Sequence, residues 1–237
     1  MPLVKANGRQ IFFAHVPKTG GSSVEDYLVQ RFGELSLIDR HKRDRLPGTG
    51  LITPSTHLTA RDLMELLPTD LDHCFAFVRE PVGRALSEYR YQLGVSRSTK
   101  FGFSTWVRLM LHSARREPRI YENHIRPQSD LVPKNATVFR LEDGFENMIT
   151  WLDEVTGTTA PDVSVGHILK RKREDLEVSC EDLAALAEYY AEDYERFGYP
   201  RPDTSEKSHD SYALLRSSFA VPMSSVIILR QRLAWLK

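Results

Sequence analysis

The stretch His15 to Ser23, HVPKTGGSS, combines residue types that bind phosphate groups, and it directly follows the apolar run 11–14. Paired glycines let the backbone come close to an anion, and a helix that follows them presents N–H groups with partial positive charge. Serine hydroxyls and a lysine add further donors. The stretch therefore predicts an anion site where a strand ends and a helix begins. Its candidate binding residues are Lys18, Thr19, Gly20, Gly21, Ser22 and Ser23.

The order of these residues is unusual for a phosphate loop. In the Walker type of P-loop the lysine follows the second glycine, whereas Lys18 precedes both glycines. A simpler alternative is a capped helix after a tight turn, because Ser22 and Glu25 have the spacing of a capping box.

A second stretch, FAFVREPVGRALSEYRY at 75–91, also places a cationic residue between the end of a strand and the start of a helix. Its apolar strand ends at Arg79, whose planar guanidinium suits a phosphate, and Pro81 suits the first turn of a helix. Ser87, in that helix, adds a hydroxyl donor. The alternatives are an ion pair between Arg79 and a neighbouring glutamate, and a plain helix-surface serine.

The two stretches resemble the 5′-phosphosulfate loop and the 3′-phosphate site of sulfotransferases that use 3′-phosphoadenosine 5′-phosphosulfate (PAPS), in the family of Golgi carbohydrate sulfotransferases and their bacterial relatives. In that family the lysine precedes the glycines, and a serine follows the strand-end arginine by eight residues. RPQSDLV (126–132), FRLED (139–143) and YYAEDYERFGYP (189–200) are also similar to the family, so the resemblance covers most of residues 10–200.

The resemblance implies a P-loop-like three-layer fold, with a central parallel sheet flanked by helices. It implies PAPS as co-substrate, adenosine 3′,5′-bisphosphate as product, and a hydroxyl group, on a carbohydrate, as acceptor. A lipid-linked sugar, a small phenol and a peptide tyrosine are the alternative acceptors.

Sulfuryl transfer requires a base for the acceptor proton and a cation for the leaving oxygen. Lys18 is expected to supply the cation. We expect His57 to be the base, because histidine is the usual general base near neutral pH and His57 lies between the two nucleotide stretches, where the resemblance places the base. The alternative is that His57 is only a polar neighbour of the next helix. His15 is the nearest rival, and orienting the loop by a hydrogen bond is its expected role.

Further candidates lie in loops. His124, Arg126 and Gln128 are candidates for contact with the acceptor, and Arg171, in the basic run 170–173, resembles in position the family's late loop over the adenine and 3′-phosphate. Exposed loop residues and charge runs are more often simply solvated. No His/Cys cluster has ligand spacing, so no metal is expected.

Strand and helix patterns alternate along the chain, which predicts an α/β fold with a parallel sheet. We expect one domain over residues 1–200 and a C-terminal appendage of one or two short helices, 201–237, packed on the same domain. The alternatives for the appendage are a dimer contact and a contact with a membrane-bound acceptor. The expected strands are 11–16, 73–78 and 136–141. One expected helix begins at Ser22, and the others cover 59–67, 81–93, 103–112, 145–155 and 181–197.

Composition excludes several classes of partner. The chain has 32 basic and 32 acidic residues, so its zero net charge gives no sign of a nucleic-acid partner. The chain has no run of about 20 apolar residues, so the sequence predicts no membrane span. Two cysteines without a disulfide pattern and a start without a signal peptide favour a bacterial cytoplasmic enzyme, or alternatively the excised luminal domain of a Golgi-type enzyme.

Two other functions remain open. A P-loop nucleotide kinase needs the lysine after the glycines and a metal-binding carboxylate at a neighbouring strand end, where this chain has Arg79. A non-catalytic nucleotide-binding module would keep the loop, show no turnover, and be indifferent to His57→Ala.

Overall fold

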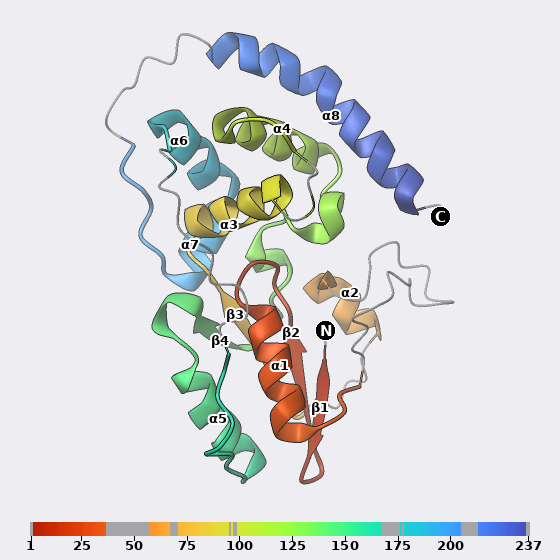
Figure 1. The fold of residues 1–237 in the computed structure, drawn as a ribbon, viewed down its shortest axis with the longest axis vertical. Coiled ribbons are helices and arrows are strands. Elements are labelled where there is room, and N and C mark those ends of the chain that lie inside the picture. Colours follow the sequence, from red (N-terminus) through yellow and green to blue (C-terminus); the bar gives the residue numbers. More distant parts are fainter. Residues whose placement is uncertain are drawn as a thin grey trace. The chain divides into compact units, whose positions relative to one another are not determined.

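The structure is a computed structural model of the 237-residue chain, and it describes residues 2–36, 57–66, 71–94, 96, 99–166, 176, 178–204 and 213–235. Figure 1 shows the helices and strands in chain order. The chain divides into two compact units. Unit 1 comprises Met1–Arg79 and Gln128–Lys172, and unit 2 comprises Glu80–Pro127 and Arg173–Lys237. The boundary expected at residue 200 stays a prediction.

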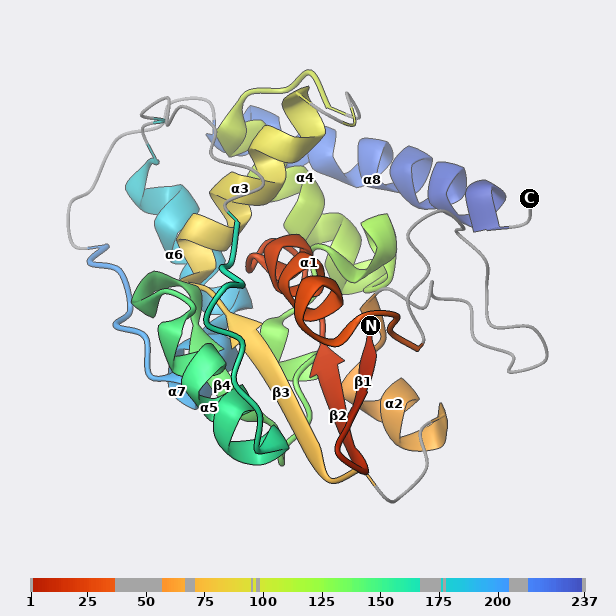
Figure 2. The same ribbon diagram turned by 60° about the horizontal axis from the view of Figure 1, so that its bottom comes forward.

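Unit 1 contains a four-stranded sheet of β1 (Leu3–Ala6), β2 (Arg9–Ala14), β3 (His73–Val78) and β4 (Thr137–Arg140). The strands lie side by side in this order (Figure 2). β1 is antiparallel to β2, whereas the β2–β3 and β3–β4 pairs are parallel. The predicted α/β class, with a mostly parallel sheet flanked by helices, is confirmed.

The first strand was not predicted. It forms a hairpin with β2 through Asn7 and Gly8, which both have positive φ, 47° and 76°. Asn-Gly is the preferred pair for the two-residue hairpin turn, so the signal was present in the sequence. The expected strand 11–16 begins two residues earlier and ends at Ala14.

The described residues of unit 1 form the helices α1 (Gly21–Phe32), α2 (Ala60–Leu66) and α5 (Glu146–Thr156). Apolar side chains of α1 and α5 pack on one face of the sheet, because both helices place apolar residues at helical spacing. Alternate residues of β2 and β3, such as Phe12 and Ala76, point to the opposite face and are also buried. The packed cluster includes Ile11, Phe13, Val24, Tyr27, Leu28, Phe75, Phe77, Met148 and Leu152.

Unit 2 is helical. It contains α3 (Pro81–Gly94), α4 (Phe103–Arg116), α6 (Cys180–Tyr189), α7 (Ala191–Phe197) and α8 (Ala213–Trp235), with a short 3-10 segment at Ile120–Asn123. α4 packs against α8 and α6, and α3 packs against α6.

The single helix expected over 181–197 is wrong. It is broken at Tyr190, whose φ of −101° and ψ of 24° are not helical. The buried Tyr190 hydroxyl donates to the Ile125 carbonyl oxygen at 2.9 Å, and the N–H of Asp193 donates to the Tyr190 carbonyl to begin α7. A tertiary contact of this kind leaves no mark on helical periodicity.

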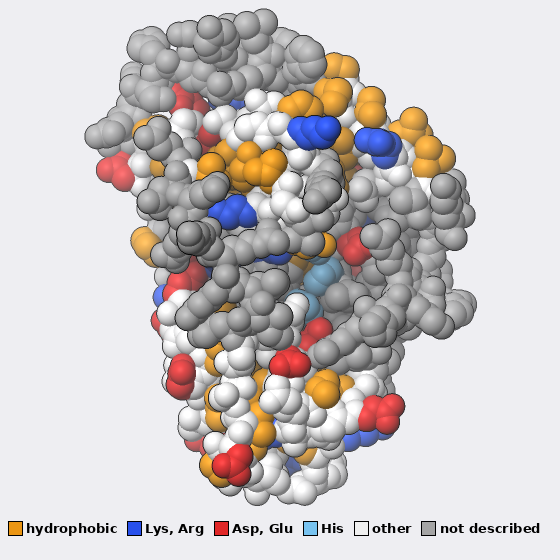
Figure 3. Space-filling view, in the orientation of Figure 1, with side chains coloured by type: hydrophobic (Ala, Val, Ile, Leu, Met, Phe, Trp, Pro, Cys, Tyr) orange, Lys and Arg blue, Asp and Glu red, His pale blue; other side chains and the backbone are white. Residues whose placement is uncertain are grey.

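The C-terminal appendage forms one long helix, α8, instead of one or two short ones. Val226, Leu229 and Leu233 are exposed on α8 at helical spacing, and hydrophobic and basic side chains gather on this surface in Figure 3. Among the described residues, no helix is both long and apolar enough to cross a membrane.

Candidate active site

The loop between β2 and α1 has the backbone of an anion-binding turn. Lys18 and Gly20 have left-handed φ angles of 68° and 85°, and α1 begins immediately afterwards at Gly21. A left-handed residue followed by a helical one makes successive N–H groups converge, which forms a concave site for an anion. The Thr19 hydroxyl donates to the Val16 carbonyl oxygen at 2.9 Å and so closes the turn from inside.

Both glycines are needed for steric reasons. A Cβ at Gly20 would lie 2.9 Å from Leu141 Cδ1 and 3.2 Å from Phe145 Cζ, and a Cβ at Gly21 would overlap the imidazole ring of His15. The loop is therefore packed closely against Leu141 and Phe145, which precede α5, and against the ring of His15.

The capping box expected at Ser22 and Glu25 is wrong. The N-cap of α1 is Gly20, without a side-chain cap, and Ser22 is an exposed residue of the first turn. Because the helix begins earlier than the pattern suggested, Glu25 lies too deep to cap it. Its carboxylate lies 2.7 Å from His15 Nδ1 instead, and both side chains are buried. Glu25 thus holds the ring that packs against Gly21.

His57 lies directly beside this pair. Its Nδ1 is 3.1 Å from the carbonyl oxygen of His15, and the two imidazole rings meet edge to face with centroids 4.8 Å apart. A carbonyl oxygen only accepts hydrogen bonds, so Nδ1 of His57 carries the proton. In the neutral ring Nε2 then has the lone pair. With this lone pair, Nε2 has the chemistry of a proton acceptor. The residue is buried, with only 6% of its surface exposed.

The start of α2 fixes the chain after His57. Thr59 and Asp62 form a reciprocal capping box, in which each backbone N–H donates to the other residue's side-chain oxygen, at 3.0 and 3.1 Å. The helix expected over 59–67 is confirmed as α2, Ala60–Leu66.

Arg79 joins the end of β3 to the anion loop. Its guanidinium Nη1 donates to the Lys18 carbonyl oxygen at 3.3 Å. β2 and β3 are adjacent parallel strands, so their carboxyl ends meet at one edge of the sheet. Lys18 and Arg79, two cationic residues 61 positions apart in the chain, thus lie side by side at this edge of the sheet.

Gln128 holds the backbone of Arg79. Its side-chain Oε1 accepts from the Arg79 N–H at 2.9 Å and its Nε2 donates to the Arg79 carbonyl at 2.8 Å. The residue is completely buried. The sequence indicated an acceptor contact for Gln128 and gave no sign of this positioning role, because a lone glutamine in a loop has no pattern.

The other candidates lie in unit 2. His124 Nδ1 is 2.8 Å from a carboxylate oxygen of Glu88, and Arg126 donates to the side chain of Asn123 at 3.0 Å. Ser87 is a half-buried residue of α3. Arg171 lies outside the described residues. In the part of the chain that is described, no three His, Cys, Asp or Glu side chains form a group that could hold a metal ion.

Comparison with known proteins agrees with the loop chemistry. No curated protein and no solved structure matches the chain. The family model described as "Sulfotransferase family", sulfotransferase family 2, matches residues 3–200. This match spans well over half of the chain and includes the anion loop, His57 and Arg79. The chain belongs to the sulfotransferase family.

Proposed function

We propose that this sulfotransferase moves a sulfuryl group from PAPS to a hydroxyl group, and that the acceptor is a carbohydrate. The observation that carries the proposal is the hydrogen bond between Arg79 and the Lys18 carbonyl, since it brings the loop of β2 and the cationic end of β3 to one edge of the sheet. A nucleotide with anionic groups at both its 5′ and 3′ positions suits two adjacent cationic sites.

The donor set fits PAPS. Residues 18–23 would hold the 5′-phosphosulfate, through the converging N–H groups of the loop, the hydroxyls of Ser22 and Ser23 and the ammonium of Lys18. Arg79 would hold the 3′-phosphate, because its guanidinium forms paired hydrogen bonds with phosphate oxygens. Ser87 and Arg171 are proposed as further ligands of the 3′-phosphate.

When bound, PAPS supplies the sulfuryl group, and a new S–O bond to the acceptor forms as the S–O bond to the phosphate breaks. We assign the acceptor proton to Nε2 of His57, since the bond from Nδ1 to the His15 carbonyl fixes the required tautomer. Lys18 would stabilise the negative charge on the leaving phosphate oxygen. His15 and Glu25 would keep the ring of His57 and the loop in register.

Carbohydrate is proposed as the acceptor class because of the resemblance to carbohydrate sulfotransferases. His124 and Arg126 are proposed acceptor contacts, whereas the hydrogen bonds of Gln128 support a positioning role for that residue.

A thermal-shift comparison tests the donor. Adenosine 3′,5′-bisphosphate at about 100 times its Kd should stabilise the protein by about 2.7 kcal/mol. For a chain of this size that raises the Tm by about 5–10 °C. ATP with Mg²⁺ should give a much smaller shift. A larger shift with ATP and Mg²⁺ would favour a nucleotide kinase and contradict the proposal.

A transfer assay tests the reaction. Labelled PAPS, incubated with a panel of acceptor sugars, should yield a labelled sugar and an equal amount of adenosine 3′,5′-bisphosphate. Binding of the nucleotide without transfer to any acceptor would indicate a non-catalytic module. Transfer to a phenol but to no sugar would refute the acceptor class alone.

A further inference from the structure

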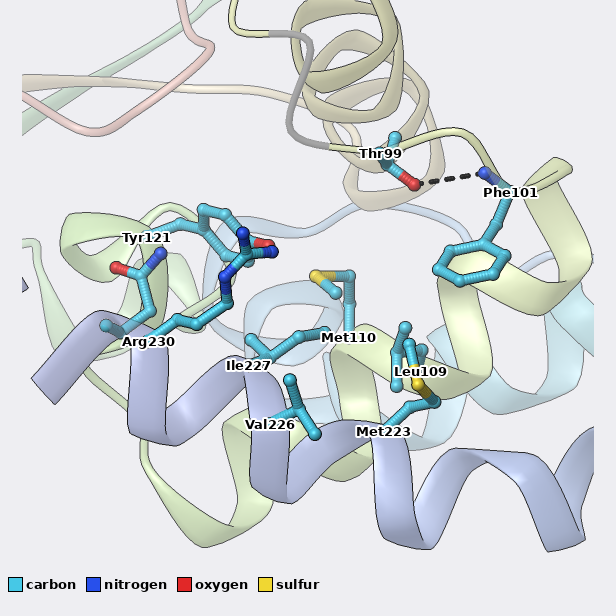
Figure 4. A pocket seen from close by; sticks show the side chains of 10 residues that line it. Thr99, Phe101, Leu109, Met110, Tyr121, Met223, Val226, Ile227 and Arg230 are labelled. Atoms are coloured by element: carbon cyan, nitrogen blue, oxygen red, sulfur yellow. Dashed lines mark hydrogen bonds between the residues drawn. The ribbon is translucent and has the colours of Figure 1, made fainter. Parts of the chain in front are cut away.

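Unit 2 contains a cavity of about 380 Å³ that no step of the sulfuryl transfer uses. One wall is α4, another is α8, and the short segment at Ile120–Asn123 closes one end (Figure 4). This volume is at the lower end of the range of about 300–1,000 Å³ that is usual for small-molecule sites.

Most of the lining is apolar. Leu109 and Met110 extend from α4, and Met223, Val226 and Ile227 extend from α8 toward them (Figure 4). Two of these five side chains are methionines, which adapt to ligands of irregular shape. The lining therefore suits an aliphatic chain.

Polar groups gather at one end, where Tyr121 lies beside Arg230 (Figure 4). Gln231 also lines the cavity. Burial, followed by the nearby charge of Glu88, raises the pKa of Tyr121, and Arg230 partly opposes this effect. The phenol hydroxyl therefore stays protonated near neutral pH and can donate. A donor next to a guanidinium forms a small site for an anionic head group.

The backbone of Tyr121 supports a specific role for this end of the cavity. Tyr121, Glu122 and Asn123 are three consecutive non-glycine residues with left-handed φ angles, 48°, 57° and 67°. Such a run is costly and persists only where its surroundings hold it. The next residue, His124, is held at its carbonyl oxygen by the buried Arg84 and at its ring by Glu88.

The other wall of the cavity lies outside the family match. α8 begins at Ala213, beyond the residues 3–200 that match the sulfotransferase family. The family match therefore gives no role to the α8 side chains of the cavity.

We propose that the cavity binds a single-chain amphiphile with an anionic head group. The aliphatic chain lies between α4 and α8, and the head group accepts hydrogen bonds from the Tyr121 hydroxyl and the Arg230 guanidinium. This inference goes beyond sulfuryl transfer and does not depend on it.

Methionine methyl groups provide the test. The chain is labelled with [methyl-¹³C]methionine and titrated with decanoate, and in parallel with decanol, which has the same chain and no charge. The methyl signals of Met110 and Met223 should shift with decanoate. Met148, in the core of unit 1, and the exposed Met64 should not. Equal shifts of all four methyl signals would overturn the proposal.

Charge variants make the test specific. Arg230→Gln should weaken decanoate binding by about tenfold, since it removes one charge-assisted contact, and leave decanol binding unchanged. Arg115→Gln is the control, because Arg115 is an exposed arginine of α4 that pairs with the exposed Glu188. Val226→Phe should fill the cavity and weaken both ligands, with circular dichroism to show that the variant is folded. Decanoate affinity unaffected by Arg230→Gln, or decanol binding as tight as decanoate, would refute the anionic head group.

Discussion

At the scale of single residues, the hydrogen bond of His57 to the His15 carbonyl determines which ring nitrogen can act. A general base contributes about 10²- to 10⁴-fold to a rate. We therefore expect His57→Ala to lower kcat by a factor in this range while the Kd for adenosine 3′,5′-bisphosphate stays within about twofold of the wild-type value. Steady-state kinetics and calorimetry measure the two quantities.

The matched control is His112→Ala, which removes a histidine of α4 in unit 2. It should leave kcat unchanged. A His57→Ala variant with full kcat would show that another group accepts the proton.

Gln128 allows the positioning of Arg79 to be separated from its charge. Gln128→Ala removes two buried hydrogen bonds to the Arg79 backbone and should cost about 1–3 kcal/mol of unfolding free energy, with weaker nucleotide binding. Arg79→Ala keeps these backbone bonds, so it should weaken nucleotide binding with a smaller loss of stability. Urea unfolding and calorimetry distinguish the two. Unchanged stability of Gln128→Ala would contradict the positioning role.

The position of the loop could be predicted from the sequence, because paired glycines between a strand pattern and a helix pattern indicate a tight turn, and the turn lies at Gly20. Glu25 could not, because its spacing from Ser22 also fits a capping box, and only the early start of α1 shows that it pairs with His15. The positioning role of Gln128 could not be predicted either, because its partner Arg79 is 49 residues away along the chain.

At the scale of elements, the close packing under the β2–α1 turn has a measurable consequence. Gly20→Ala adds a Cβ at a left-handed position (φ 85°, ψ 10°) and 2.9 Å from Leu141, whereas Gly157→Ala adds one at another left-handed position (φ 64°, ψ 24°) with open space around it. Both should lose about 1–2 kcal/mol from backbone strain. Gly20→Ala should lose a further 1–3 kcal/mol, roughly, from overpacking.

Gly20→Ala alone should also weaken binding of adenosine 3′,5′-bisphosphate, because Gly157 lies at the C-terminal end of α5 and not in the loop. Chemical denaturation and calorimetry check these differences. Equal losses of stability and of affinity in the two variants would contradict the described packing of the turn.

A buried carboxylate directly after α4, that of Glu117, accepts a hydrogen bond from Arg232 of α8 at 3.1 Å. Burial alone would raise the pKa of Glu117, but hydrogen bonds from Arg119 and Arg232 outweigh it and lower the pKa below its usual value of 4.5. A lowered pKa means that the native state favours the ionised form. The stabilisation that Glu117 gives the native state is therefore complete above its pKa in the unfolded state. It is lost as the pH falls through its pKa in the native state.

We therefore expect Glu117→Gln to lower the Tm at pH 7, with a difference from wild type that shrinks as the pH falls below about 4.5. Thermal unfolding at several pH values measures this. A constant difference at all pH values would show that the carboxylate charge does not contribute. The exposed pair Arg115–Glu188 offers a control, since Glu188→Gln should change the Tm little at any pH.

Helix and strand positions could largely be predicted because buried strands and amphipathic helices have distinct periods. The hairpin strand β1 was missed although Asn7 and Gly8 mark its turn, and the break at Tyr190, whose hydroxyl bonds to the Ile125 carbonyl, has no pattern in the sequence. Such tertiary contacts are not local properties of the sequence.

At the scale of the whole molecule, the alternation of strands and helices predicted the α/β class. Neither the order of the strands nor the division into two units could be predicted, because both depend on which distant segments pair. Because the net charge of the chain is zero, any site for an anion must be a local property. A few cationic groups and N–H groups at one edge of the sheet would have to hold a polyanion.

The most direct test of this account compares adenosine 3′,5′-bisphosphate with 5′-AMP, which lacks the 3′-phosphate, by calorimetry on wild type, Lys18→Ala and Arg79→Ala. We expect the wild type to prefer the bisphosphate, Lys18→Ala to bind both nucleotides more weakly, and Arg79→Ala to lose the preference while binding 5′-AMP nearly as before. If Arg79→Ala retains the full preference, or if Lys18→Ala binds both nucleotides as the wild type does, the proposed two-ended nucleotide site at the edge of the sheet is wrong.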